Sequence, residues 1–215
     1  VGKNDKGEPI GISPDIARLI AKKIDIKCKF ILFERPGQLA DVVNNDVWDI
    51  GNIAFEPERG NTIDFSKPYV LIDANFLVKN ESNLLINEDI DKQENTIVVA
   101  DRSAYDLWLK SNFKNSKIVR VKSIDDSHTF YRDGKANVLA GLRPKLIDEI
   151  QLQNDDRIID KPFTYIKQSV GFKKNFPEVI EFINSVISEA IEDGYIKSSL
   201  QKHNVDKKLS IPKSN

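Results

Sequence analysis

Short apolar runs alternate with amphipathic helical patterns along this chain of 215 residues. Helical spacing begins at Ser13, where the serine suits an N-cap, the next residue is a proline suited to a first turn, and an aspartate follows. Extended apolar runs follow at 28–33 and 48–54, and a second helix is expected around Leu39. Because strand, helix and strand are joined by short links, this part of the chain predicts a parallel sheet with helices on its faces.

A second α/β series begins beyond residue 78. The last long helix, 179–191, needs an apolar partner and has Gly194 as its stop, so we expect the chain to return to the first series near residue 170. The expected fold is α/β with two lobes and a ligand cleft between them. Lobe 1 is predicted to hold residues 1–77 and 170–215, and lobe 2 residues 78–169, with strands at 96–100, 118–121, 137–142 and 157–159 and helices at 103–113, 125–132 and 144–152.

Composition excludes several classes of function. Lysine and arginine number 32 against 33 acidic residues, so no nucleic-acid partner is implied, and no apolar run is long enough to span a bilayer. The single cysteine, Cys28, excludes an internal disulfide and a cysteine zinc cluster, and we expect it to be a buried residue of a strand. The two histidines, His128 and His203, are well separated, so we expect no metal site, no cofactor and no catalytic triad.

The absence of methionine indicates that the sequence is not a complete translated one. A signal peptide, where the natural protein has one, is expected to have been removed or left out.

Residues 48–70 contain one arginine, Arg59, in a polar turn that follows an apolar run. A guanidinium offers a planar fork of donors that matches a carboxylate in bidentate geometry. An arginine fixed at the end of a strand is therefore suited to capture a small carboxylate. A solvated arginine on a surface loop is the alternative that this motif alone leaves open.

Motifs in this chain follow the order in which they occur in family 3 of the bacterial extracellular solute-binding proteins, the polar amino acid class. They are 11–17 (GISPDIA), 48–50 (WDI) with 56–59 (EPER), 63–69 (IDFSKPY), 102–104 (RSA), 133–138 (DGKANV) and 169–174 (SVGFKK). The ordered set covers nearly the whole chain, which therefore resembles this family.

The resemblance implies a type II periplasmic-binding-protein fold, in which each lobe is a mainly parallel sheet flanked by helices. It implies a periplasmic, monomeric protein without enzymatic activity. Such a protein captures a small carboxylate-bearing solute, an amino acid or an amino-acid-like acid, by hinge closure. It then delivers the solute to the membrane permease of an ABC importer.

The resemblance also assigns ligand-binding roles by position. Arg59 would bind the carboxylate, and the backbone at Asn52 and Ala54 would supply a carbonyl and an amide to the ligand's charged head. Ser103 and Ala104, at a helix start in lobe 2, would add N–H groups, which agrees with the affinity of helix N-termini for anions.

Departures from the family pattern affect the same site. Leu142 stands where the family commonly has an aspartate that pairs with the ligand's α-ammonium, and burying an ammonium against leucine costs several kcal/mol. Either another acid, Asp101 or Glu34, replaces that aspartate, or the ligand lacks an α-ammonium. Arg143 beside Leu142 favours an anion or forms a surface salt bridge.

Arg35 stands in place of an aromatic platform that the family often has before its second helix. A stacked guanidinium or a bare backbone is expected to line that wall instead. The family also has a core strand before the position of Val1, so we expect residues to be missing there.

Two other functions fit the two-lobe architecture. A cyclohexadienyl or arogenate dehydratase-like enzyme needs a general acid near the leaving group, and Glu34 is the residue to propose for it. A ligand-sensing domain of a membrane receptor would use the same kind of binding site.

Overall fold

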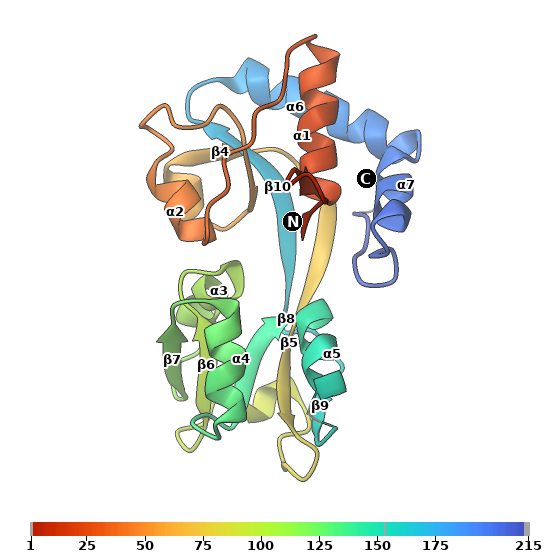
Figure 1. The fold of residues 1–215 in the computed structure, drawn as a ribbon. Helices are drawn as coiled ribbons and strands as arrows, with labels where there is room; N and C mark the ends of the chain where they lie inside the picture. Colours follow the sequence, from red (N-terminus) through yellow and green to blue (C-terminus); the bar gives the residue numbers. More distant parts are fainter. Residues whose placement is uncertain (1, 153, 213–215) are drawn as a thin grey trace. The chain divides into compact units, whose positions relative to one another are not determined.

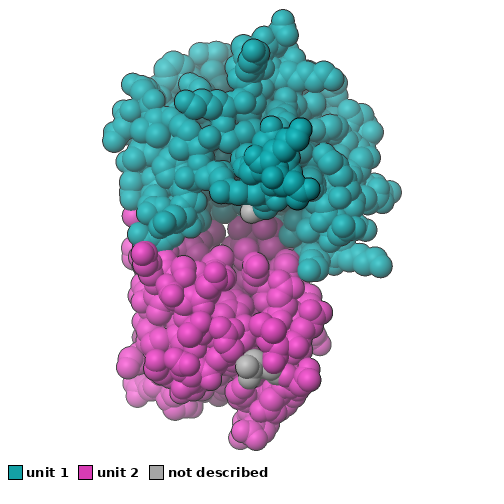
Figure 2. Space-filling view, in the orientation of Figure 1, with its two compact units in different colours: residues 1–71, 167–215 teal, residues 72–166 magenta. Residues whose placement is uncertain are grey.

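The computed structural model describes residues 2–152 and 154–212. The chain forms two compact units, which Figure 2 colours separately: unit 1 is Val1–Leu71 with Lys167–Asn215, and unit 2 is Ile72–Ile166. The fold class is α/β, as the sequence predicts. The described helices include none with the length and hydrophobicity that crossing a membrane would require.

Unit 1 is built around helix α1 and the two helices at the end of the chain, α6 and α7 (Figure 1). Ile16 and Ile20 of α1 are buried against Ile187 of α6 and Leu200 of α7, with Tyr69 in the same cluster. The elements of unit 1 are β1 (Gly2–Lys3), β2 (Pro9–Ile10), α1 (Ile12–Lys23), α2 (Pro36–Asp41), β3 (Gly51–Ala54), η1 (Arg59–Asn61), β4 (Ile63–Phe65), the start of β5 (Val70–Lys79), the end of β10 (Thr164–Lys173), α6 (Pro177–Glu192) and α7 (Tyr195–Lys202).

The start of α1 differs from the expected one in its cap. The N-cap is Gly11, not Ser13, and no side chain caps the helix. Gly11 has a φ of 127°, a region that favours glycine, and the helix begins at Ile12, two residues earlier than an N-cap at Ser13 would place it. The Ser13 hydroxyl instead lies 2.8 Å from the hydroxyl of Tyr69.

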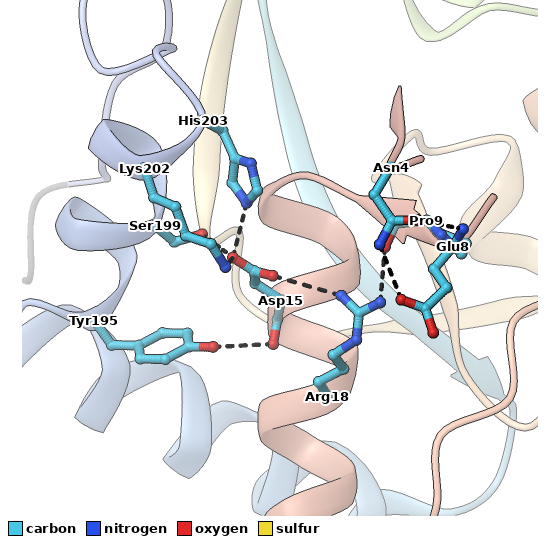
Figure 3. A network of polar contacts seen from close by, with 9 residues as sticks. All are labelled: Asn4, Glu8, Pro9, Asp15, Arg18, Tyr195, Ser199, Lys202 and His203. Atoms are coloured by element: carbon cyan, nitrogen blue, oxygen red, sulfur yellow. Dashed lines mark hydrogen bonds and ion pairs between the residues drawn. The ribbon is translucent and has the colours of Figure 1, made fainter. Parts of the chain in front are cut away.

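Asp15 joins α1 to α7 through a network of polar contacts (Figure 3). Its carboxylate accepts hydrogen bonds from the Ser199 hydroxyl at 2.8 Å and from His203 Nε2 at 2.9 Å. Lys202 Nζ lies 3.4 Å and Arg18 Nη1 3.6 Å from the same carboxylate. Ser199 and His203 lie more than 180 residues along the chain from Asp15. The network therefore fixes α7, near the C-terminus, to α1, near the N-terminus.

The strand predicted at 28–33 is wrong. Residues 26–33 pair with no strand among the described residues, and Cys28 is only partly buried. The side chains of Ile26, Ile31 and Leu32 are 59%, 45% and 51% exposed. A strand requires a neighbour for its N–H and C=O groups, and a local apolar pattern cannot supply one.

This difference also changes the sheet of unit 1, which we expected to be mainly parallel. β3 pairs antiparallel with β10, with Ala54 opposite Gln168, and β4 pairs antiparallel with the same strand. The reason is that β10 is the strand on which the chain returns. With 28–33 outside the sheet, the pairs of β1 with β2, of β3 with β10 and of β4 with β10 are all antiparallel.

Unit 2 contains the expected parallel pairs. β6 lies between β7 and β8 and is parallel to both, whereas β5 and β8 are antiparallel. Helix α4 packs against β6, β7 and β8, and α5 packs against β8 and β9. The elements of unit 2 are the rest of β5, η2 (Asn87–Asp89), β6 (Thr96–Ala100), α3 (Ala104–Asn112), β7 (Lys117–Val121), α4 (Ile124–Arg132), β8 (Val138–Leu142), α5 (Arg143–Leu152), β9 (Asp156–Ile158) and the start of β10.

Gly171 of β10 lies where β3 and β4 pack together, and a side chain there is expected to destabilise unit 1. A Cβ at this position would lie 2.8 Å from Ile63 Cγ2 and 3.3 Å from Ile53 Cγ2. Overpacking of this kind costs about 1–3 kcal/mol. We therefore expect Gly171→Ala to lower the free energy of unfolding by that amount in urea denaturation. Gly60→Ala is the control, because a Cβ there meets nothing within 4 Å, and equal stabilities of the two variants would contradict the packing.

Candidate functional site

The end of β3 holds the buried side chain of Arg59. Arg59 is the first residue of η1, but its guanidinium points back to the end of β3. There Nη1 donates a hydrogen bond to the Ala54 carbonyl at 2.9 Å. The residue is only 6% exposed. A buried guanidinium needs anionic or carbonyl partners, because an unpaired buried charge is costly. This position therefore suits capture of a small anion, and the solvated surface arginine considered above does not describe it.

Asn52 is fixed on the same strand by a chain of hydroxyl groups. Its Oδ1 accepts a hydrogen bond at 3.1 Å from the hydroxyl of Tyr69, which lies 2.8 Å from the hydroxyl of Ser13. Tyr69 is fully buried, and its burial raises the pKa of the phenol, which keeps the hydroxyl protonated as a donor. The structure thus brings together Asn52, Ala54 and Arg59 in unit 1.

Unit 2 brings together another part of the predicted site. Ser103 is the N-cap of α3, and its hydroxyl accepts a hydrogen bond from the Asp106 N–H at 3.1 Å. The Asp106 carboxylate in turn accepts a hydrogen bond from the Arg102 N–H at 2.8 Å. Ala104 is the first residue of the helix, where N–H groups have no partner inside the helix.

Leu142 ends β8, which is parallel to β6, so it lies at the same edge of the sheet as the residues that follow β6. It is partly buried. Arg143 next to it has a partner, because its Nη1 donates to the Asp160 carbonyl at 3.3 Å and its Nη2 lies 3.8 Å from the Asp160 carboxylate. Arg143 therefore forms the ion pair that was the second of its two predicted roles.

The remaining predicted residues lie in both units. Arg35 is the N-cap of α2, its backbone N–H is held by the Gln38 side chain at 3.2 Å, and its buried Nε donates to no described residue. Glu34 is exposed in the turn before α2. Asp101 follows β6 in unit 2, where its N–H donates to the Val121 carbonyl at 2.8 Å.

Glu56 is an acidic residue near Arg59 that belongs to the 56–59 motif but received no ligand-binding role from it. It lies between Ala54 and Arg59 in the sequence and is partly buried. Burial raises the pKa of its carboxyl to about 7, although the positive charges of Arg59 and Lys167 act in the opposite direction. The sequence signal that would have revealed it is its place two residues after Ala54, on the same face of an extended chain.

Both histidines are held in polar networks. His128 Nδ1 lies 2.7 Å from the carboxylate of Glu149, which Arg132 also binds, at 2.8 Å. His203 belongs to the network of Asp15. Within residues 2–152 and 154–212, no cluster of three or more histidine, cysteine or acidic side chains has the arrangement of a metal site.

Comparisons with known proteins agree with the fold of both units. The model of the bacterial extracellular solute-binding proteins, family 3, matches residues 2–206. The L-cystine-binding protein TcyJ of Escherichia coli (strain K12) is 23% identical over 205 residues, which are 93% of this chain and 76% of that protein.

Two solved structures share the fold. The solute receptor for L-cysteine of Neisseria gonorrhoeae has a TM-score of 0.81 and 17% identity, with 98% of this chain and 90% of that chain covered. An ancestral amino acid-binding protein, a precursor of cyclohexadienyl dehydratase, has a TM-score of 0.76 and 22% identity, with 93% and 88% covered. Because the family match extends over almost the entire sequence, the chain belongs to family 3 of the bacterial extracellular solute-binding proteins.

Proposed function

We propose that this protein is an extracytoplasmic, monomeric solute-binding protein that captures an amino acid, or a similar small acid, through its carboxylate. The observation that carries this function is the buried Arg59, held by the Ala54 carbonyl at 2.9 Å at the end of β3. Its guanidinium offers several N–H donors in a fixed plane, which suits a carboxylate better than other small anionic or neutral groups. Relatives named for binding L-cystine and L-cysteine support an amino acid as the ligand.

The first helix of unit 2 supports the same function. The N–H group of Ala104, the first residue of α3, favours an anion through the helix dipole, whereas the Ser103 N–H already donates to the Ala100 carbonyl at 3.3 Å. The chain passes between the units twice, at 71–72 and 166–167. We propose that ligand-driven closure of the units follows capture and that the closed protein delivers the solute to the permease of an ABC importer.

A thermal-shift screen tests carboxylate capture. We expect one or more of the common L-amino acids and L-cystine to raise Tm, whereas sugars and polyamines leave it unchanged. A ligand at 100 times its Kd adds about 2.7 kcal/mol to the free energy of unfolding. For a chain of this size, that corresponds to a rise in Tm of about 5–10 °C. No rise with any amino acid, keto acid or dicarboxylate would contradict the proposed function.

The proposed function involves no chemical step. We expect prephenate and arogenate to remain intact when they are incubated with the protein at high concentration, with substrate followed by absorbance and chromatography. This assay addresses the dehydratase alternative directly, because that reaction consumes both acids. Protein-dependent loss of either acid would overturn the non-enzymatic assignment.

A further inference from the structure

The face of β3 that carries Asn52 and Ala54 continues to Glu56. Pairing with β10 extends one residue beyond the strand, because the Phe55 N–H donates to the Lys167 carbonyl at 2.9 Å. Side chains of an extended chain alternate between its two faces. Asn52, Ala54 and Glu56 therefore share one face of this segment.

The opposite face confirms this alternation. Ile53 lies against the position of Gly171, where a Cβ would be 3.3 Å from its Cγ2, and Ile63 borders the same position. The ring of Phe55 packs edge-on against Phe65, with 5.4 Å between the ring centroids. Both odd-numbered residues thus point to the side of β4, which leaves Glu56 on the side of Asn52.

The Glu56 carboxylate is next to charged groups, but it receives no hydrogen bond from the described residues. It is partly buried. The charged groups near it are Arg59 and Glu58 of the same turn and Lys167 of β10. A carboxylate that is partly removed from water without a hydrogen-bonded partner is costly to ionise, and an incoming cation would offset that cost.

We propose that the Glu56 carboxylate binds the ammonium group of an amino-acid ligand whose carboxylate is held by Arg59. In an α-amino acid the ammonium and carboxylate groups are joined through one carbon, so their partners must be neighbours. Arg59 folds back onto Ala54, two residues before Glu56, which places the acid and the arginine at the end of the same strand. This role depends on the carboxylate capture proposed above and supplies the cation partner that Leu142 cannot provide.

Calorimetric titrations at pH 6 and pH 8 test this role with named pairs of probes. The probes are the L-amino acids that raise Tm, each compared with its 2-hydroxy-acid analogue, which keeps the carboxylate and lacks the positive charge. Because the pKa of Glu56 is about 7, its ionised fraction rises about tenfold between these two pH values. We expect the amino acid to bind up to about tenfold more tightly to the wild-type protein at pH 8.

In Glu56→Gln, we expect amino-acid affinity at pH 8 to fall at least about tenfold and its pH dependence to disappear, while the hydroxy acid binds as before. Glu58→Gln is the matched control, because Glu58 is an exposed acid of the same turn. Its charge makes the smallest contribution to the raised pKa of Glu56, so the variant should keep the affinity at pH 8 and retain a pH dependence, with its midpoint moved slightly to lower pH. Melting curves establish that the variants are folded, and Glu56→Asp, which retains the charge, should recover part of the affinity.

The outcomes separate this role from carboxylate capture itself. Wild-type affinity and pH dependence in Glu56→Gln would overturn the role of Glu56 and leave Arg59 as the carboxylate site. Binding of hydroxy acids but not of amino acids by the wild-type protein would also overturn the role of Glu56 and leave Arg59 as the carboxylate site. Failure of both amino acids and hydroxy acids to bind the wild-type protein would instead overturn the proposed function.

Discussion

Replacing Arg59 by alanine is expected to weaken amino-acid binding by about 30-fold to 5,000-fold, the range that corresponds to about 2–5 kcal/mol. The reason is that the variant leaves the ligand's carboxylate without its bidentate, charged partner. Arg59 is 6% exposed and is held by the Ala54 carbonyl, so no other conformation is needed to present it. Isothermal titration calorimetry of the two proteins with the same amino acid measures this change in Kd.

Arg59→Lys is the matched variant. It keeps the positive charge and loses the planar fork, so its affinity should lie between those of the alanine variant and the wild-type protein. Circular dichroism melts of both variants show whether the fold is retained. Wild-type affinity in a folded Arg59→Ala protein would rule out Arg59 as the carboxylate partner.

Replacing Asp15 by alanine is expected to be the most destabilising of the substitutions considered, with a loss of about 2–4 kcal/mol in the free energy of unfolding. Asp15 is 6% exposed and accepts hydrogen bonds from Ser199 and His203, and its loss leaves the buried Ser199 hydroxyl without a partner (Figure 3). Urea denaturation followed by circular dichroism measures the effect. Asp206→Ala is the control, because this acid is exposed near the same end of the chain.

The same carboxylate makes unit 1 sensitive to acid. Burial by itself would raise the pKa of Asp15, but the hydrogen bonds from Ser199 and His203 and the charge of Lys202 outweigh it, so the pKa is lowered. A group whose pKa is lower in the folded state than in the unfolded state stabilises the protein at pH values above its pKa in the unfolded state. This contribution is lost as the pH falls through its pKa in the folded state. We therefore expect the stability difference between wild type and Asp15→Ala to shrink below pH 4. A constant difference down to pH 2 would contradict this assignment.

Most helices could be predicted from local signals because those signals act within a few residues. Ser103 caps α3 as its pattern indicates, and Gly194 adopts a φ of 78° after α6, which is the left-handed conformation expected of a helix stop. The segment 28–33 was misassigned because a strand depends on a partner that its own residues do not specify. The antiparallel sheet of unit 1 was missed for the same reason, since its central strand, β10, returns from the far end of the sequence.

The same limit applies to the candidate site, whose ligand-binding residues remain predictions. Arg59 was proposed from the sequence because it has a sequence motif and a side chain with one dominant chemistry. Glu56 was not, because its orientation follows from the pairing of Phe55 with Lys167, a contact between residues 112 positions apart. Likewise, the partner of Arg143 is Asp160, and nothing in the local sequence distinguishes that acid from its neighbours.

The central claim is that the protein recognises its ligand through the carboxylate. The most direct measurement is a calorimetric titration of the wild-type protein with the amino acid that gives the largest thermal shift and with the C-terminal amide of that amino acid. The amide retains the side chain and the ammonium group but cannot accept the bidentate, charged hydrogen bonds of Arg59. We predict that the amide binds at least about 100-fold more weakly, which corresponds to about 2.7 kcal/mol. Equal affinities for the acid and its amide would contradict the account.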